Sequence, residues 1–196
     1  MDESRLIKRA QDGDNKAFEV LIEAHFKNIY NIAYRIAGNP DDASDMTQEV
    51  MIKLFRNIGS FGGNSKFSTW VYRVATNTCL DELKKIRRHS TYSINSEIDT
   101  GEGEFLYEVE DTSPTPDLKV EQGELSNMVA TAINSLSLEH KAIITLRDIQ
   151  DFSYEEIANI LNLSEGTVKS RLSRARMQLK KILVKDFNFS GTYFSE

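Results

Sequence analysis

Apolar residues recur at every third or fourth position through the first part of the chain. The stripe begins at Leu6 and reaches Ile36, and this spacing predicts amphipathic helices. Gly38-Asn39-Pro40 ends the first long helix, and a proline suits the first turn of the next. Two aspartates follow this proline and favour the same start, because acidic side chains stabilise the positive end of a helix. We expect this next helix to span residues 40–56.

The segment 90–124 breaks the helical pattern. Ser, Thr, Gly and acidic residues dominate it, and Pro114 and Pro116 oppose a helix there, so we expect a disordered linker. Helical spacing returns from Leu125 to Leu183, and no stretch alternates with the period of a strand. The pattern predicts an all-α fold of two small helical domains joined by a flexible acidic linker. The expected domains are residues 1–89 and 125–184, with a tail at 185–196.

The net charge of −6 is unevenly distributed. Residues 90–124 hold ten acidic residues and one lysine, so the rest of the chain carries a net charge of +3. The sequence therefore indicates two mildly basic modules joined by an acidic segment. This distribution is compatible with nucleic-acid binding, which the total charge alone would oppose.

Several classes of protein are disfavoured by what the sequence lacks. Cys79 is the single cysteine, which suits a reducing compartment, and with the three histidines it gives no metal-ligand spacing, so we expect no metal site. There is no apolar stretch long enough to cross a membrane and no secretory leader pattern. Neither a glycine-rich phosphate loop nor a nucleophile elbow is present. We expect a cytoplasmic protein without a cofactor or catalytic residues, and thus not an enzyme.

The C-terminal domain contains a helix-turn-helix pattern. Ser153 and Glu156 form a capping box that opens a short helix. A turn over residues 162–164 leads to a second helix, expected from Glu165 to about Leu183. The second helix has a polar and basic face that suits the major groove, where arginine reads guanine edges and lysine neutralises phosphates, although a solvated basic face is the alternative. The candidate DNA-binding residues are Ser164, Thr167, Lys169, Ser170, Arg171, Arg174 and Arg176.

Two helices of the N-terminal domain carry distinct polar faces. The first has an acidic face at residues 40–56, whose like charges destabilise an isolated helix and favour a basic partner; solvation of this face is the alternative. Its residues are Asp42, Asp45, Gln48 and Glu49. The second helix, expected over residues 69–88, has a stripe of an aromatic, an amide and bases beside a glycine-rich loop, which suits single-stranded nucleic acid. This stripe contains Trp70, Val74, Asn77, Asp81, Lys84 and Arg88. Alternatively, Trp70 belongs to the core and the bases complement the helix dipole.

Together these segments resemble the extracytoplasmic-function group of bacterial sigma factors. Residues 41–50 resemble the polymerase-clamp motif of that family, and residues 60–83 resemble the part that melts and reads the minus-ten element. Residues 154–176 resemble the reader of the minus-thirty-five element. The resemblance covers about residues 4–89 and 125–183. The chain departs from the family pattern at Leu136-Ser137, where Leu-Pro is usual, and Ser is also a competent helix cap.

The resemblance implies an alternative sigma factor that directs core RNA polymerase to specific promoters. Its two domains would be the sigma region 2 helical bundle and the sigma region 4 helix-turn-helix. The acidic face would dock on the β′ clamp helices, and the β flap is a further expected contact. Phe61, Val74 and Asn77 would form a pocket for a flipped base, and Asn64 and Lys66 would tune minus-ten specificity.

An anti-sigma factor is a further expected partner, which would hold the protein inactive and in some cases at the membrane. An autonomous helix-turn-helix regulator that binds duplex DNA without polymerase is the alternative function. That alternative leaves the acidic face and the single-strand stripe of the N-terminal domain unexplained.

Overall fold

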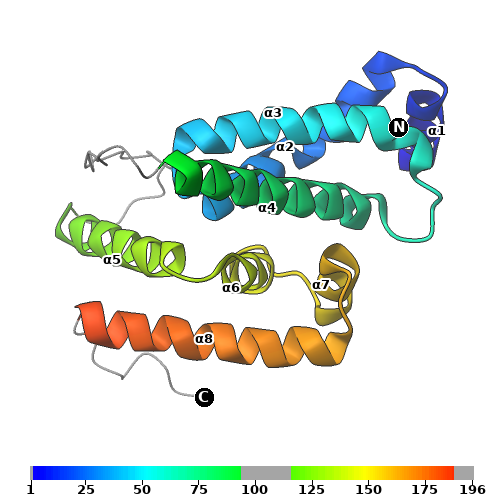
Figure 1. Cartoon of the computed structure of the whole chain (residues 1–196). Coiled ribbons are helices and arrows are strands. Elements are labelled where there is room, and N and C mark those ends of the chain that lie inside the picture. Colours follow the sequence, from blue (N-terminus) through cyan, green and yellow to red (C-terminus); the bar gives the residue numbers. More distant parts are fainter. Residues whose placement is uncertain (1, 94–115, 188–196) are drawn as a thin grey trace.

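The computed structural model describes residues 2–93 and 116–187 (Figure 1). Within these two ranges every regular element is helical, which confirms the all-α prediction. The elements are α1 (Glu3–Gln11), α2 (Asn15–Ala37), α3 (Pro40–Asn57), η1 (Ile58–Ser60), α4 (Phe67–Ser93), α5 (Pro116–Asn134), α6 (Leu138–Ile144), η2 (Thr145–Ile149), α7 (Tyr154–Leu161) and α8 (Glu165–Phe187).

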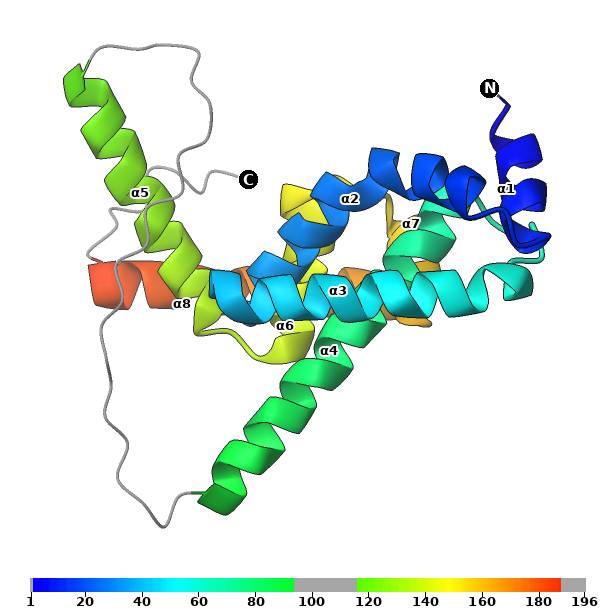
Figure 2. The ribbon, with the colours of Figure 1, turned by 90° about the horizontal axis from the view of Figure 1, so that it is seen from above.

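The N-terminal domain is a bundle in which α2, α3 and α4 pack on one another and α1 packs on α2 (Figures 1 and 2). Its centre is apolar: Ile29, Ile32, Leu54 and Val71 have no solvent exposure. Removing a side chain of this size from water contributes about 1.5–3 kcal/mol. The predicted apolar stripe of the N-terminal helices is therefore the core of this domain.

The predicted break between α2 and α3 is confirmed by its geometry. Gly38 has a φ of 89°, a left-handed conformation that ends α2 and that other residues adopt with strain. The Asn39 side chain then caps α3 by accepting a hydrogen bond from the backbone N–H of Asp42 at 2.9 Å. Pro40 occupies the first turn, where its missing N–H is not needed.

The thiol of Cys79 is buried inside the N-terminal domain. It has no solvent exposure, and burial raises its pKa to about 12. Because the thiolate is the reactive form, we expect the native protein to react with Ellman's reagent at neutral pH only on opening or unfolding. The measurement is the rate at which the reagent releases thionitrobenzoate, with and without urea. Rapid reaction of the folded protein would contradict this placement.

The C-terminal domain contains α5, α6, η2, α7 and α8. Ile143, Leu146, Ile157 and Val168 are fully buried and come from four of these elements. The turn η2 has π-helical hydrogen bonding, which the sequence pattern did not predict. α7 and α8 form the predicted helix-turn-helix, and Asn162 adopts a left-handed conformation between them.

The prediction that Pro114 and Pro116 exclude a helix was wrong for the last part of the expected linker. α5 begins at Pro116, because a proline is well tolerated at the first helical position. The remainder of the expected linker, residues 94–115, lies outside the described residues. The same holds for residues 188–196 of the expected tail.

The capping box predicted for α7 is confirmed. The Ser153 hydroxyl accepts from the backbone N–H of Glu156 at 3.2 Å, and the Glu156 carboxylate accepts from the Ser153 backbone N–H at 3.0 Å. We expect Ser153→Ala to lower the free energy of unfolding by about 1 kcal/mol. Urea unfolding measures this effect, and Ser173→Ala on the exposed side of α8 is the matched control. Equal stability of the two variants would contradict the role of the cap.

The same box gives stability a pH dependence. Hydrogen bonds from the backbone N–H and the hydroxyl of Ser153 lower the pKa of Glu156 below its ordinary value. The nearby ammonium group of Lys66 lowers this pKa further. Glu156 therefore contributes stability that is present above the ordinary glutamate pKa and is lost as the pH falls through the lowered value.

The two domains are in contact in this structure. α4 packs on α7 and α6, while α2 packs on α5, α6 and η2, so the helix-turn-helix lies beneath the N-terminal bundle in Figure 1. Among the described helices, none is both long enough and apolar enough to cross a membrane.

Candidate protein and nucleic-acid binding surfaces

The predicted acidic face lies along the first half of α3. Asp45 and Gln48 are exposed, and Asp42 and Glu49 are half-buried beside them. Asp42 accepts a hydrogen bond from Asn39 at 2.8 Å, and Glu49 lies 3.7 Å from the ammonium group of Lys53. The structure therefore brings all four residues onto one side of a rigid helix, as the periodicity predicted.

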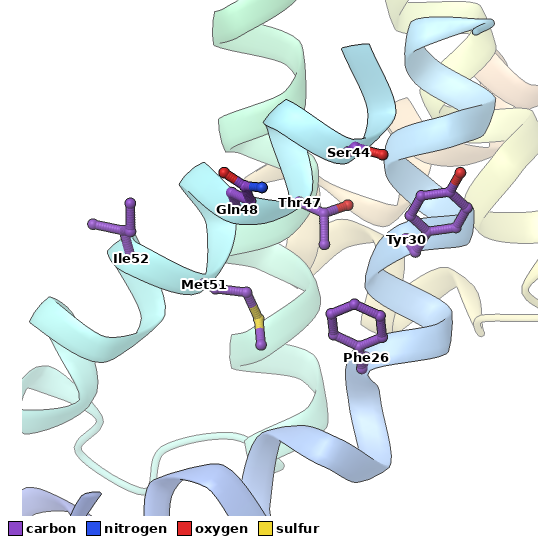
Figure 3. Close-up of a pocket in the computed structure, with 7 residues that line it drawn as sticks. All are labelled: Phe26, Tyr30, Ser44, Thr47, Gln48, Met51 and Ile52. Carbon is purple, nitrogen blue, oxygen red and sulfur yellow. The ribbon is translucent and has the colours of Figure 1, made fainter. Parts of the chain in front are cut away.

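An apolar groove of about 680 Å³ adjoins the acidic face. Figure 3 shows Phe26 and Tyr30 of α2 facing Thr47 and Met51 of α3 across this groove. Its lining residues are Phe26, Tyr30, Ser44, Thr47, Gln48, Met51 and Ile52. Gln48 belongs to both surfaces, so a partner on the acidic face also reaches the groove. Sequence reasoning missed Phe26 and Tyr30, although their spacing of four residues marks a second apolar stripe on α2.

A second pocket, of about 370 Å³, lies between the end of α3, η1 and the middle of α4. It brings together three of the predicted minus-ten residues, Trp70, Val74 and Asn77. Asn77 is exposed and Val74 is half-buried, whereas Trp70 is only 5% exposed and forms part of the wall. The other lining residues, none of them among the predicted DNA contacts, are Lys53, Asn57, Ser60, Arg73, Thr78 and Asp81.

Aromatic rings support this pocket from behind. Phe61 packs against Trp70 and Phe67, with ring centroids 5.7 Å and 5.4 Å apart. Phe61 therefore contacts the wall of the pocket and does not line it. The burial of Trp70 fits the alternative stated above, that this residue belongs to the core.

The remaining predicted minus-ten residues lie apart from the pocket. Asn64 and Lys66 are exposed in the loop before α4 and face α7 across a separate polar hollow. Lys84 and Arg88 are exposed further along α4, where the Lys84 ammonium group lies 3.4 Å from Asp81. The predicted minus-ten residues are therefore divided among a pocket, the loop before α4 and the basic end of α4.

The helix α8 presents the predicted basic face. Ser164 caps it by accepting from the backbone N–H of Thr167 at 3.2 Å, so its hydroxyl has a structural role. Lys169, Ser170 and Arg174 are exposed, and the Ser170 hydroxyl donates to the Thr167 carbonyl at 3.1 Å. The opposite side of the helix is buried in the domain core through Val168, Leu172 and Ala175.

Two of the predicted arginines are oriented by carboxylates of the same domain. Arg171 lies 3.2 Å from Glu139 in α6. Arg176 donates two hydrogen bonds to Asp148 of η2, the one from Nε measuring 3.1 Å, and this carboxylate raises the pKa of Arg176. Pairing of this kind fixes guanidinium geometry, because the arginine fork matches a carboxylate.

A metal site is not found among the described residues: no group of three His, Cys, Asp or Glu side chains in residues 2–93 and 116–187 is arranged to hold an ion.

Two family models match separate parts of the chain. The family model for Sigma-70 region 2 matches residues 21–89, and the model for Sigma-70 region 4 matches residues 126–179. The ECF RNA polymerase sigma factor SigW of Bacillus subtilis is 37% identical over 178 residues, covering 90% of this chain and 94% of SigW. The ECF RNA polymerase sigma-E factor of Escherichia coli K12 is 36% identical, covering 87% and 88% of the two chains.

A solved structure is similar across both domains. The sigma factor RpoE of Bartonella quintana, determined in complex with the anti-sigma factor NepR, matches with a TM-score of 0.66 at 25% identity. The match covers 87% of this chain and 99% of RpoE. The region 2 match accounts for the N-terminal domain, which an autonomous helix-turn-helix regulator leaves unexplained. The chain belongs to the extracytoplasmic-function sigma factors, the alternative sigma factors that direct bacterial RNA polymerase to promoters.

Proposed function

We propose that three surfaces of this chain divide the work of promoter recognition. The observation that carries the proposal is the pocket of about 370 Å³ beside Val74 and Asn77, which lies within the size range of small-ligand sites. The pocket accepts one flipped base of the non-template strand. The Asn77 amide, which both donates and accepts hydrogen bonds, reads the edge of that base.

The acidic face on α3 docks on the β′ clamp helices of core polymerase. Asp45 is exposed, and no described side chain forms an ion pair with it, so it is available to a basic partner. The adjacent apolar groove receives apolar side chains of the same partner, because exposed apolar patches rimmed by polar residues mark interaction sites. The C-terminal domain contacts the β flap.

The basic face of α8 reads the upstream promoter element. Lys169 and Arg174 are exposed and reach phosphates or base edges in the major groove. Arg171 is oriented by Glu139 and enters the same groove. Arg176 is held by Asp148, and it contacts DNA only if that pairing is exchanged or shared.

An anti-sigma factor controls the chain and, when it is membrane-bound, holds the chain at the membrane. Support comes from the similarity to RpoE, which was solved with the anti-sigma factor NepR. Affinity capture from native cells tests this part. Recovery of core polymerase alone under every growth condition would exclude an anti-sigma partner.

The experiment for the promoter-reading proposal is run-off transcription by core RNA polymerase on a library of bacterial promoter fragments, with and without this chain. We expect new transcripts whose templates share two sequence blocks at a fixed separation. Substituting Arg174 with Ala should weaken selection at the upstream block and leave the block near the start site unchanged. Transcripts without any shared upstream block would contradict the role of α8.

A further inference from the structure

A buried lysine connects the two domains. Lys141, in α6 of the C-terminal domain, is only 3% exposed. Its ammonium group donates to the backbone carbonyl of Ile36 in α2 at 3.3 Å and to Oδ1 of Asn134 at 3.1 Å. A buried ammonium group is unfavourable unless it is hydrogen-bonded, so these acceptors define where Lys141 can sit.

The carbonyl of Ile36 needs a donor from outside its own helix. In a continuing helix it would accept from the residue four positions later, but that residue is Pro40, which has no N–H. α2 ends at Ala37, so the Ile36 carbonyl belongs to the last turn, where the helix dipole also favours a cation. Lys141 therefore acts as a C-terminal cap of α2 that is supplied by the other domain.

The surroundings of this cap are closely packed. Gly38 follows α2, and a Cβ atom at this position would lie 3.1 Å from Oδ1 of Asn134. The absence of a side chain at Gly38 thus allows Asn134 to approach. Elsewhere in the interface, the ring of Tyr72 in α4 lies 5.1 Å from the ring of Phe152 before α7.

The same interface engages Asn77, to which we assign base reading, and Lys66, which the sequence predicts to tune minus-ten specificity. The Lys66 ammonium group lies 3.2 Å from the Glu156 carboxylate of α7. The Asn77 amide donates to the backbone carbonyl of Ile160 in α7 at 3.5 Å. A DNA strand that takes over the hydrogen-bonding groups of both Lys66 and Asn77 must therefore break these two contacts with α7.

We propose that Lys141 latches the polymerase-free chain in a closed arrangement, in which α7 lies over part of the minus-ten surface, and that promoter reading requires this latch to open. The latch itself rests on the contacts of Lys141. Its consequence for promoter reading rests on the proposed function, through the base-reading role given to Asn77.

Distance measurement between spin labels tests the latch on the free, full-length chain. Arg56 on α3 and Ser173 on α8 are exposed and are replaced by cysteine for labelling, while the buried Cys79 stays in place. We expect one dominant distance. Lys141→Met keeps the side-chain length but leaves the Ile36 carbonyl without its donor, and it should raise the ratio of open to closed chains at least about tenfold, seen as a second, longer distance.

Two further variants make the test decisive. Lys185→Met removes an exposed lysine of α8 and should leave the distance unchanged. Lys66→Glu places a carboxylate opposite Glu156 and should shift the distribution in the same direction as Lys141→Met, by about threefold, since this pair is exposed. Circular dichroism checks that each variant is folded. If Lys141→Met is unfolded, the distances measured for Lys66→Glu decide whether the closed arrangement exists.

The latch is overturned if the unsubstituted chain already shows a broad distribution of long distances. It is equally overturned if a folded Lys141→Met protein, or Lys66→Glu in its place, matches Lys185→Met. None of these measurements uses polymerase or DNA. A failed latch therefore leaves the proposed function standing, and failed transcription leaves the measured distances intact.

Discussion

Replacing Asp45 and Glu49 together with lysine should weaken binding to core RNA polymerase about 100-fold and abolish transcription at limiting protein. Both residues lie on the acidic face of α3, next to the apolar groove. The substitutions turn attraction to a basic surface into repulsion, while the buried side of α3, which holds Val50 and Leu54, is unchanged. Binding is measured by fluorescence anisotropy of the labelled chain titrated with core enzyme.

The matched control reverses two charges elsewhere in the same domain. Glu3 and Asp12, at the two ends of α1, are exposed. Figure 2 shows α1 near the C-terminal end of α3, away from the end that carries the acidic face. Glu3→Lys with Asp12→Lys makes the same change in net charge, so it separates a local contact from a general electrostatic effect. Equal loss of affinity in both double variants would show that the acidic face is not the docking site.

Asn77→Ala should reduce the rate of open-complex formation by about tenfold while core binding stays within about twofold of the unsubstituted chain. The substitution removes the amide that reads the flipped base, without altering the buried neighbours Ala75 and Cys79. A 2-aminopurine probe at each non-template position reports base flipping as a rise in fluorescence. We expect the unsubstituted chain to give this rise at one position and Asn77→Ala to give no rise there.

Asn159→Ala is the control, because Asn159 is an exposed amide on α7 that does not line this pocket. Asn77→Ala also removes a contact with α7, which by itself would favour opening of the closed arrangement. Slower formation of the open promoter complex would therefore be seen even though the two domains of the protein separate more easily. Unchanged or faster promoter opening by Asn77→Ala would contradict the base-reading role.

Local sequence signals predicted the helices well where the chain itself supplies the cap. Ser153 with Glu156 and Asn39 with Asp42 start helices at the expected positions, because their hydrogen bonds join residues only three apart. The prediction for Pro116 was wrong because a proline that opposes a helix interior is tolerated in the first turn of a helix.

Contacts between the domains could not be predicted in this way. Lys141 looks like a surface lysine in the sequence, and its burial becomes intelligible only beside the Ile36 carbonyl, 105 residues earlier. The groove likewise needs Phe26 and Met51 from different helices. Trp70 shares a stripe with Val74 and Asn77, yet it packs against Phe61 and is buried in the wall of the pocket. Periodicity places residues on a face of a helix, but the packing of other helices decides which of them stay accessible.

Permanganate footprinting of a promoter, with core polymerase and this chain added separately and together, shows whether the chain enables polymerase to melt promoter DNA. Permanganate oxidises unpaired thymines, so it reports melting without depending on later steps of transcription. We predict that thymines just upstream of the start site become reactive only when both proteins are present. Fully paired DNA in that mixture, together with tight, salt-sensitive protection of the duplex by the chain alone, would contradict promoter melting by this sigma factor.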